Sequence, residues 1–328
     1  MTLKFMKKII LIATIFLFFN SVAKAADTEI YEISGIEKWF NSKPIKISNL
    51  RGKVVLVDFW AYSCVNCLRS LPNLIELDKK YRAKNLVLIG VHSPEFDFEK
   101  NSANVKKALK KYGIKYPVAM DNNLQTWRNF NNHFWPAQYL LDKEGKLVYY
   151  HFGEGDHEVL ENKIRTLLNI DDEIVVKNND RQFSLAPLTP EIYLGSERSE
   201  GNLNWPKTIL TFPESVTQHG WALQGKWKIE NQFIESKNIN DSIKLSFVAK
   251  KVFLVMSSAS GKSVKVKIFL DDKEIDPSDY GTDVINGSVI VKDSRLYSLV
   301  NLSQKKSGVI ELQVGDKGLR AYAFTFGM

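Results

Sequence analysis

The sequence of 328 residues is poor in cysteine, since it has only Cys64 and Cys67, two positions that enclose two residues. A structural disulfide usually closes a long loop, because cross-linking distant residues removes most entropy from the unfolded chain. A bridge between Cys64 and Cys67 would close almost nothing. The scarcity of cysteine therefore excludes a disulfide-stapled scaffold and favours a redox role for the pair.

Other features are missing as well. No second cysteine pair is present and none of the five histidines lies near Cys64 in sequence, which argues against zinc, a metal that takes about four ligands. The net charge of +8 is spread among acidic residues without a basic stripe and interleaved aromatics, so we expect no nucleic-acid partner. Beyond the N-terminus no run is long and apolar enough for a transmembrane helix.

The N-terminus predicts an export signal over residues 1–25. Lys4, Lys7 and Lys8 precede an apolar run from Ile9 to Phe19, and Ala23-Lys24-Ala25 supplies small residues at the cleavage positions. The apolar run is shorter than the ~20 residues that span a bilayer, although an uncleaved anchor is the alternative interpretation. We therefore expect a mature protein that is soluble after cleavage and periplasmic or otherwise extracytoplasmic.

Residues 26–170 predict an α/β domain, because apolar strand patterns alternate with helical periodicity. The expected strands cover 53–60, 86–91, 116–119, 138–141 and 146–152, and the expected helices cover 68–81, 101–112, 124–130 and 157–168. The cysteine pair falls on the loop between the first of these strands and the helix that follows. That loop is where α/β folds place their chemistry.

The character of the sequence changes after residue 170. Residues 171–190 are rich in acids and asparagines with two prolines, which indicates a linker. Residues 191–328 predict an all-β domain, an antiparallel sandwich or jelly roll, because short β-rich runs are separated by turn residues. Its expected strands are 226–235, 242–249, 252–257, 263–270, 288–292, 296–301, 308–314 and 319–326.

The spacing of the two cysteines suits thiol–disulfide exchange, in which one thiolate attacks a disulfide and a second thiol resolves the mixed disulfide. A cysteine at a helix start lies where the helix dipole favours negative charge, so we expect a lowered pKa for Cys64. Cys64 is therefore the predicted attacking residue and Cys67 the resolving one. The redox-active pair needs no further cofactor.

Asp58 and Pro136 are the other predicted catalytic residues. Asp58 lies within an apolar strand six positions before Cys64. Burial raises the pKa of a carboxyl group, and such a group beneath the pair can serve as general base for Cys67; a surface-facing aspartate is the alternative. A cis proline beside the pair would expose a backbone edge that binds an extended substrate, although most X–Pro bonds are trans. Candidate substrate-binding residues around the site are Trp60, Tyr62, Glu95, Trp135, and the intervening residues Val65 and Asn66.

The stretch from Val57 to Cys67 resembles the thioredoxin active site, with Asp58 and Trp60 on its buried-acid and tryptophan positions. Val65-Asn66 stands where thioredoxin has Gly-Pro, and Ser63 stands where it has tryptophan. The intervening pair tunes the reduction potential, so the resemblance does not carry the potential over.

Further motifs resemble a narrower group, the extracytoplasmic region of the DipZ proteins, a branch of the TlpA/redoxin-like thioredoxins. In the first domain they are Gly90–Phe96, Trp135–Ala137 and His151–Gly155; in the second they are Thr189–Gly195, Trp221–Leu223 and Ala321–Gly327. The resemblance implies that Pro136 is the cis proline and that the second domain is a carbohydrate-binding-like module. DipZ proteins carry a membrane region, where this sequence has a predicted signal peptide.

The resemblance implies an exported thiol–disulfide oxidoreductase, a reductase of extracytoplasmic protein disulfides, with a membrane electron-transfer protein of the CcdA/DsbD type as its reductant. Carbohydrate is a further expected partner, bound on an aromatic platform drawn from Trp205, Trp221, Trp227, Tyr280, Tyr297 and Tyr322, although aromatics in β-sandwiches are mostly core residues. A thiol peroxidase of the redoxin class, and a sugar- or partner-binding protein with a vestigial redox domain, are the alternative functions.

Overall fold

A computed structural model describes residues 31–170, 188–204 and 210–328. The predicted signal peptide and nearly all of the predicted linker lie outside the described residues. Tyr31–Met328 group into one compact unit. Within the described ranges, no helix is both long enough and apolar enough to cross a membrane.

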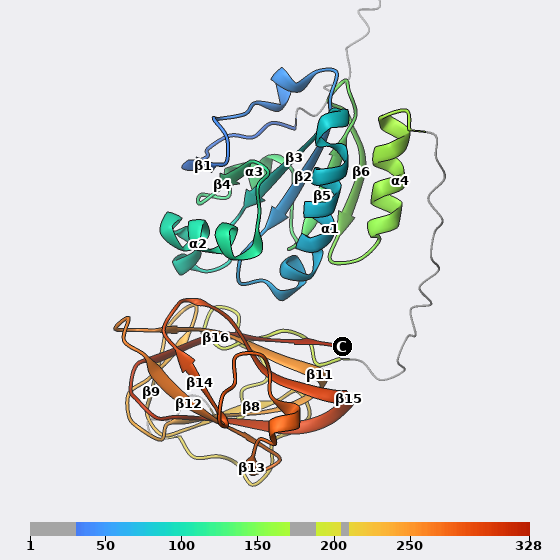
Figure 1. The fold of residues 1–328 in the computed structure, drawn as a ribbon. Helices are drawn as coiled ribbons and strands as arrows, with labels where there is room; N and C mark the ends of the chain where they lie inside the picture. Colours follow the sequence, from blue (N-terminus) through green and yellow to red (C-terminus); the bar gives the residue numbers. More distant parts are fainter. Residues whose placement is uncertain (1–30, 171–187, 205–209) are drawn as a thin grey trace, which may run out of the picture. The chain divides into compact units, whose positions relative to one another are not determined.

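The first domain is built on a six-stranded mixed sheet (Figure 1). The strand order is β1-β4-β3-β2-β5-β6, and β2 pairs in parallel with β3 and antiparallel with β5. The strands are β1 (Lys38–Phe40), β2 (Val54–Trp60), β3 (Leu86–His92), β4 (Val118–Met120), β5 (Ala137–Leu141) and β6 (Leu147–Phe152). The strand that precedes the cysteines is therefore central and covered on both faces.

Four α-helices accompany this sheet: α1 (Val65–Tyr81), α2 (Ser102–Tyr112), α3 (Gln125–Asn129) and α4 (His157–Leu167). Three short 3-10 turns lie in the connections: η1 (Ile47–Leu50) between β1 and β2, η2 (Arg82–Lys84) between α1 and β3, and η3 (Asp97–Lys100) between β3 and α2. Alternate residues of β2 enter two separate cores. Leu56 packs in one core with α1, α2 and α4, while Val57 packs in the other with residues of α3. The predicted α/β thioredoxin fold is confirmed.

Helix α1 begins three residues earlier than the periodicity predicts, at Val65 rather than at residue 68. Cys64 is its N-cap residue and accepts a hydrogen bond on Sγ from the backbone N–H of Cys67. Both cysteines therefore belong to the helix start. The short strand β1 was not predicted, because three residues show too little periodicity.

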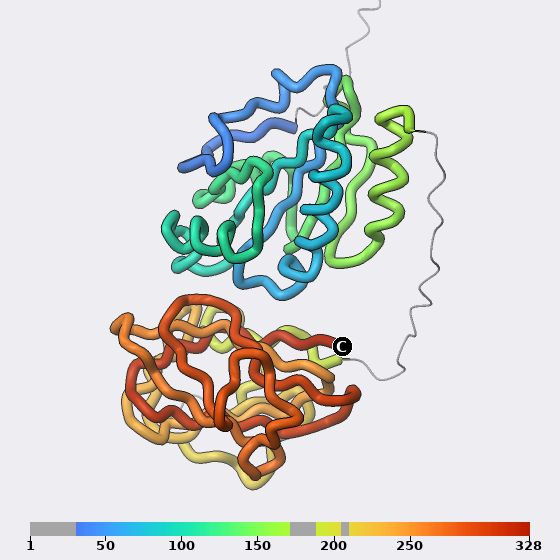
Figure 2. Tube along the Cα trace, viewed as in Figure 1, coloured from blue at the N-terminus to red at the C-terminus, as the bar shows by residue number. Residues whose placement is uncertain are grey.

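The second domain is all-β, and its described residues contain no α-helix (Figure 2). Its named strands all pair antiparallel, as predicted. They are β7 (Ile192–Tyr193), β8 (Trp221–Gln224), β9 (Trp227–Ile229), β10 (Ile234–Ser236), β11 (Ser242–Ser258), β12 (Val264–Leu270), β13 (Lys273–Glu274), β14 (Ser288–Val291), β15 (Arg295–Val314) and β16 (Leu319–Gly327), with the 3-10 turn η4 (Pro277–Asp279).

Two long strands replace four shorter predicted ones in this domain. β11 runs through both 242–249 and 252–257, and β15 runs through 296–301 and 308–314. Between Ala249 and Lys251 the partner on β15 jumps from Lys306 to Asn301, so three extra residues of β15 are accommodated there, and side chains on both sides of this irregularity are buried. The reverse occurs at 226–235, which folds as the hairpin of β9 and β10. β8 was missed.

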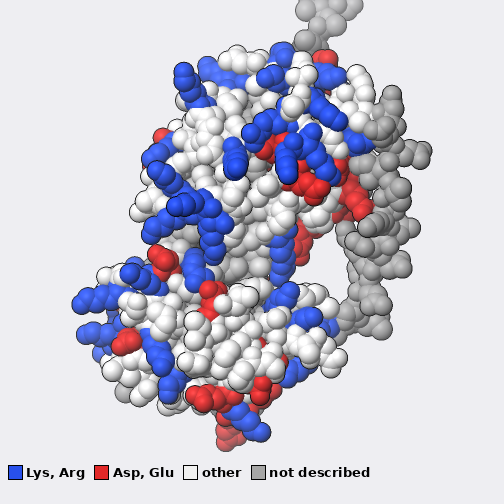
Figure 3. Space-filling view, viewed as in Figure 1, with Lys and Arg blue, Asp and Glu red and all other residues white. Residues whose placement is uncertain are grey.

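The positive net charge is dispersed on the face drawn in Figure 3. Lys and Arg side chains lie there in several separate groups, with acidic side chains beside some of them. On this face the charge does not gather into one continuous stripe.

Candidate active site

The two cysteines occupy the β2–α1 junction and differ in exposure. Cys64 is half-buried, whereas Cys67 is 1% exposed. The backbone N–H of Cys67 donates to Cys64 Sγ at 3.2 Å, so the two groups are in direct contact. This geometry suits an accessible attacking thiol followed by a buried resolving thiol, which are the predicted roles.

The expectation of a lowered pKa for Cys64 is wrong for this structure. Burial raises the pKa of Cys64, and the negative charge of Glu95 adds to the effect, while hydrogen bonding with Cys67 acts in the opposite direction. Burial also raises the pKa of Cys67 well above its ordinary value. The cost of desolvating the thiolate therefore outweighs the stabilisation of negative charge expected at the start of a helix.

Asp58 is fully inside the domain, which excludes the surface-facing alternative. Burial raises its pKa to about 8. Neither carboxyl oxygen has a hydrogen-bond donor among the described residues, and Gln138 lies directly opposite on β5. The charge of Asp58 contributes to the raised pKa of Cys67, so the two groups are electrostatically coupled, as a general base and its thiol must be.

Pro136 follows a cis peptide bond with Trp135, as the resemblance implied. Trp135 is half-buried, donates its indole N–H to the carbonyl oxygen of Ser93 at 2.9 Å, and packs on the ring of Trp127 at 4.2 Å between centroids. These contacts join the proline loop to the residues that follow β3.

Three of the candidate substrate-binding residues do not face an open surface. Trp60, Tyr62 and Val65 are 0%, 4% and 6% exposed. Trp60 contacts the ring of His92 edge-on and Tyr62 stacks on it, and burial lowers the pKa of His92 to about 3, which keeps this ring neutral. The aromatic residues therefore support the site from within, because the apolar strand carries them into the core.

Asn66, between the cysteines, is half-buried and held by Arg69. Arg69 Nη1 donates to Asn66 Oδ1 and to Glu154, each at 3.2 Å, and its Nη2 donates to the carbonyl oxygen of Phe326 at 3.3 Å. The residues between the cysteines are thus fixed by α1 and, through Arg69, by the last strand of the second domain.

Glu99, which sequence reasoning missed, joins the redox loop to the segment after β3. Its Oε1 accepts from the N–H and the hydroxyl of Ser63 at 3.1 and 2.8 Å, and its Oε2 accepts from the N–H of Glu95 and of Phe96 at 2.7 and 3.1 Å. Burial, with the charge of Glu95, raises its pKa to about 7. The only sequence feature that could have pointed to Glu99 as a site residue was its position four residues after the candidate Glu95.

Glu95, a candidate substrate-binding residue, is instead paired with the second domain. Its Oε1 accepts from the Tyr193 hydroxyl at 2.6 Å and from Arg198 Nη1 at 2.9 Å. Next to it, Phe96 and Phe98 pack against Tyr322. Sequence reasoning missed Tyr193 and Arg198 because they lie about one hundred positions away along the chain.

Comparison with known proteins gives the same assignment as the geometry. Residues 39–168 match the family model described as Redoxin, and residues 189–327 match the one described as Thioredoxin like C-terminal domain. The thiol–disulfide oxidoreductase ResA of Bacillus anthracis is 32% identical over 125 residues, which cover 38% of this chain and 69% of ResA.

The chain belongs to the redoxin branch of the thioredoxin-like thiol–disulfide oxidoreductases.

Its redoxin domain and C-terminal domain together resemble DipZ. Protein DipZ of Mycobacterium tuberculosis is 35% identical over 311 residues, which cover 90% of this chain and 42% of DipZ. The chain thus spans less than half the length of this relative. Among solved structures, a thiol:disulfide interchange protein DsbE of Chlorobium tepidum is 31% identical, with 38% of this chain and 86% of that chain covered and a TM-score of 0.35.

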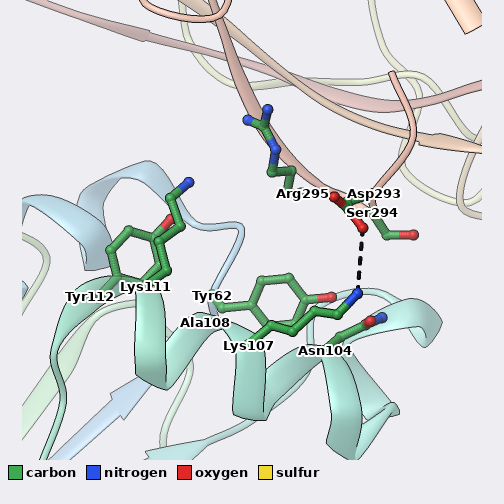
Figure 4. Close-up of a pocket in the computed structure, with 9 residues that line it drawn as sticks. All are labelled: Tyr62, Asn104, Lys107, Ala108, Lys111, Tyr112, Asp293, Ser294 and Arg295. Atoms are coloured by element: carbon green, nitrogen blue, oxygen red, sulfur yellow. Dashed lines mark ion pairs between the residues drawn. The ribbon is translucent and has the colours of Figure 1, made fainter. Parts of the chain in front are cut away.

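A separate pocket of about 250 Å³ lies where α2 meets the turn before β15 (Figure 4). Lys107 and Lys111 line it from α2, Asp293 lines it from the turn, and Arg295 lines it from the first position of β15. Lys107 Nζ and Asp293 Oδ1 are 3.6 Å apart. Neither cysteine lines this pocket, so it is not the redox site.

The aromatic platform predicted for the C-terminal domain is largely interior. Trp221, Tyr297 and Tyr322 are 0%, 1% and 4% exposed. Trp227 and Tyr280 are partly buried and pack against the core, and Trp205 lies outside the described residues. Among the aromatics that the structure describes, a carbohydrate site would therefore depend on Trp227 and Tyr280.

Proposed function

We propose that this chain is an exported reductase of protein disulfides that works outside the cytoplasm through the Cys64–Cys67 pair. Two thiols carry the two electrons that a disulfide takes up, so the pair needs no separate cofactor. The export part of the proposal rests on the basic and apolar N-terminal segment of the sequence.

The direction of electron flow is supported by the raised pKa of both thiols. A dithiol with strongly stabilised thiolate is an oxidant, because its reduced form is favoured. Here burial disfavours the thiolates, and the charge of Glu95 adds to this at Cys64. The reduced pair is therefore poorly stabilised and gives up its electrons readily.

The first step belongs to Cys64. Its thiolate attacks one sulfur of the substrate disulfide, forms a Cys64–substrate disulfide and breaks the substrate S–S bond. The other substrate sulfur leaves as a thiolate and takes a proton from solvent. Cys64 suits this step because it is the less buried of the two thiols.

The second step belongs to Cys67 and Asp58. Asp58 takes the proton of Cys67, whose sulfur attacks Cys64 Sγ, forms the intrachain disulfide and releases the second substrate sulfur. Two electrons have then passed from the pair to the substrate. With a pKa of about 8, Asp58 is a stronger base than an ordinary carboxylate, which narrows the gap to the raised pKa of Cys67.

The proposal is tested by the reduction potential of the pair and by insulin reduction. We expect a potential at or below the ~−270 mV of thioredoxin, because the thiolates are disfavoured. Cys64→Ser should abolish insulin reduction, whereas Cys67→Ser should accumulate a mixed disulfide. A potential near the ~−120 mV of DsbA would contradict the reductase direction, and peroxide consumption by Cys67→Ser would support the peroxidase alternative.

The electrons would come from a membrane electron-transfer protein of the CcdA/DsbD type, as the resemblance to DipZ suggests. Thiol trapping in cells tests this part separately. We expect the Cys64–Cys67 pair to become oxidised when such transporters are deleted. A pair that stays reduced after all are deleted would contradict the proposed reductant and leave the thiol chemistry unaffected.

A further inference from the structure

Glu95 is a buried carboxylate whose ionic partner comes from the C-terminal domain. Its side chain is 7% exposed and accepts from Arg198 Nη1 and the Tyr193 hydroxyl. A buried carboxylate without a cation or donors is costly. The C-terminal domain therefore supplies both the cation and the hydroxyl donor that Glu95 contacts.

Arg198 is itself held in place by aromatic rings. Its guanidinium carbon lies 3.7 Å from the ring centroid of Tyr193 and 5.4 Å from that of Phe96. Arginine stacks on aromatic faces while its N–H groups bind a carboxylate. Tyr193 belongs to the C-terminal domain and Phe96 to the redoxin domain, so Arg198 contacts aromatic rings of both domains.

Glu95 is connected to the attacking thiol through Glu99. The Glu99 carboxylate accepts from the N–H of Glu95 on one oxygen and from Ser63 on the other. Ser63 immediately precedes Cys64. A displacement of Glu95 is thus transmitted to the residue that positions the thiol.

The charged and titratable groups around Glu95 come from both domains. Cys64 and Glu99 face it from the redoxin domain, and Glu191, Tyr193 and Arg198 face it from the C-terminal domain. The charges of Glu95 and Glu191 both raise the pKa of Cys64, and Arg198 brings a positive charge to the group. The Tyr193 hydroxyl lies 2.6 Å from Glu95 and 2.8 Å from Glu191 and donates its one proton to either.

We propose that Arg198 and Tyr193 are positioning residues of the redox centre, which hold the Glu95 carboxylate beside the Cys64 loop and neutralise its charge. The C-terminal domain then takes part in the thiol chemistry. The role of these residues depends on the proposed function, in which Cys64 is the attacking thiol.

The test measures the rate of Cys64 alkylation by iodoacetamide against pH, in the full chain with Cys67→Ser, where Cys64 is the remaining thiol. The midpoint of this pH profile reports the ionisation of Cys64. Removing the cation with Arg198→Gln should raise the midpoint by about 0.5–1 pH unit, because the charge of Glu95 is no longer offset. Glu95→Gln should lower the midpoint by a similar amount. Since both charges are then absent, the double variant should return close to the parent, and Arg198→Lys should keep the parent midpoint.

Lys107→Ala is the matched control, because Lys107 and Asp293 form another ion pair between the same two domains, in a pocket that neither cysteine lines (Figure 4). Its midpoint should equal that of the parent. Tyr193→Phe removes only a hydroxyl and should change the midpoint in the same direction as Arg198→Gln, by less.

Two results would overturn the proposal. Arg198→Gln and Glu95→Gln could shift the midpoint in the same direction, which would indicate a general disturbance of the loop, or Arg198→Gln could leave it unchanged. Failure of the proposed function looks different: a Cys67→Ser parent that is not alkylated, while Cys64→Ser is, would show that Cys64 is not the reactive thiol.

Discussion

The two domains treat a buried aspartate in opposite ways. In the redoxin domain, Asp58 is 1% exposed, and its oxygens have no hydrogen-bond donor among the described residues. In the C-terminal domain, Asp241 is 2% exposed and accepts from the backbone N–H groups of Lys226, Lys237 and Asn238 at 2.7–2.8 Å. Asp58 has only the Gln138 side chain opposite it, whose interaction lowers the carboxyl pKa against the larger effect of burial, whereas Asp241 is surrounded by backbone donors.

This difference separates a structural acid from a chemical one. Burying a carboxylate is costly unless hydrogen bonds replace its water. Asp241 recovers that cost by joining the turn before β9 to the segment after β10. Asp58 recovers little of this free energy. The fold therefore tolerates a destabilising carboxylate near Cys67, where a proton acceptor is useful. Glu99 combines features of both acids, because it accepts from four donors, as a structural acid does, and is bonded to Ser63 in the redox loop.

Asp58→Asn should give the largest effect, with opposite signs for stability and activity. The pKa of Asp58 is about 8 in the folded protein against an ordinary 3.8, so its stabilising contribution is complete below pH ~4 and is lost as the pH rises through 8. Asparagine does not titrate. The variant should therefore gain up to about 5 kcal/mol in unfolding free energy relative to wild type by pH 9, while insulin reduction falls at least tenfold.

Urea unfolding of the full chain at pH 4 and pH 9 measures the stability part. The gain should be small at pH 4, because Asp58 is protonated in the folded protein and this pH is only just above the ordinary pKa of 3.8 that the group has in the unfolded chain. A variant that is less stable than wild type at pH 9 would show that the buried carboxylate has partners after all.

The same substitution in the C-terminal domain should act in the other direction. Asp241→Asn places an amide N–H₂ group against backbone N–H donors, and each buried group left unpaired costs about 1–3 kcal/mol. We expect a loss of about 2–4 kcal/mol, similar at both pH values, with insulin reduction unchanged in the fraction that remains folded. Asp279→Asn, at the half-buried end of the turn η4 in the same domain, should change the unfolding free energy by less than about 0.5 kcal/mol. Equal losses in the two variants would remove the contrast with Asp58.

Glu99→Gln should have the smallest effect on stability, about 1–2 kcal/mol, because one oxygen and its donors remain. The pKa of Glu99 is raised to about 7 from an ordinary 4.5, so its stabilising contribution is complete below pH ~4.5 and is lost as the pH rises through 7. Urea midpoints between pH 4.5 and 8 should therefore depend less on pH in the variant. Glu144→Gln, in an exposed turn, is the control, and a variant with the wild-type pH dependence would contradict the role of Glu99.

Much of the site could be predicted from local sequence. The continuous run Val54–Val57 indicated a strand covered on both faces and so favoured a buried Asp58 over a surface-facing one, and the structure confirms the burial. The helical periodicity after Cys67 located the helix that carries the pair. It missed the first turn of α1, because the cap that starts this helix is a cysteine side chain rather than an apolar residue.

The contacts that tune the thiols could not be predicted in the same way. Glu99 lies 36 positions from Ser63, and Arg198 lies 103 positions from Glu95. The pairing of Asp58 with Gln138 depends on the antiparallel register of β2 and β5. Periodicity reports only which face a residue occupies, and it carries no information about which distant residue faces it. Tyr62 and Val65 were expected to contact substrate but are buried, because the residues that cover them lie elsewhere in the sequence.

The sequence by itself determined the chemistry: two cysteines at the start of a helix, an acid in an apolar strand before them, and an all-β domain from residue 191. Tertiary structure alone decided the electrostatics of that chemistry. The ionisation of a thiol depends on its desolvation and on the charges near it in space, and at Cys64 both depend on the folded surroundings, including charged residues of the C-terminal domain.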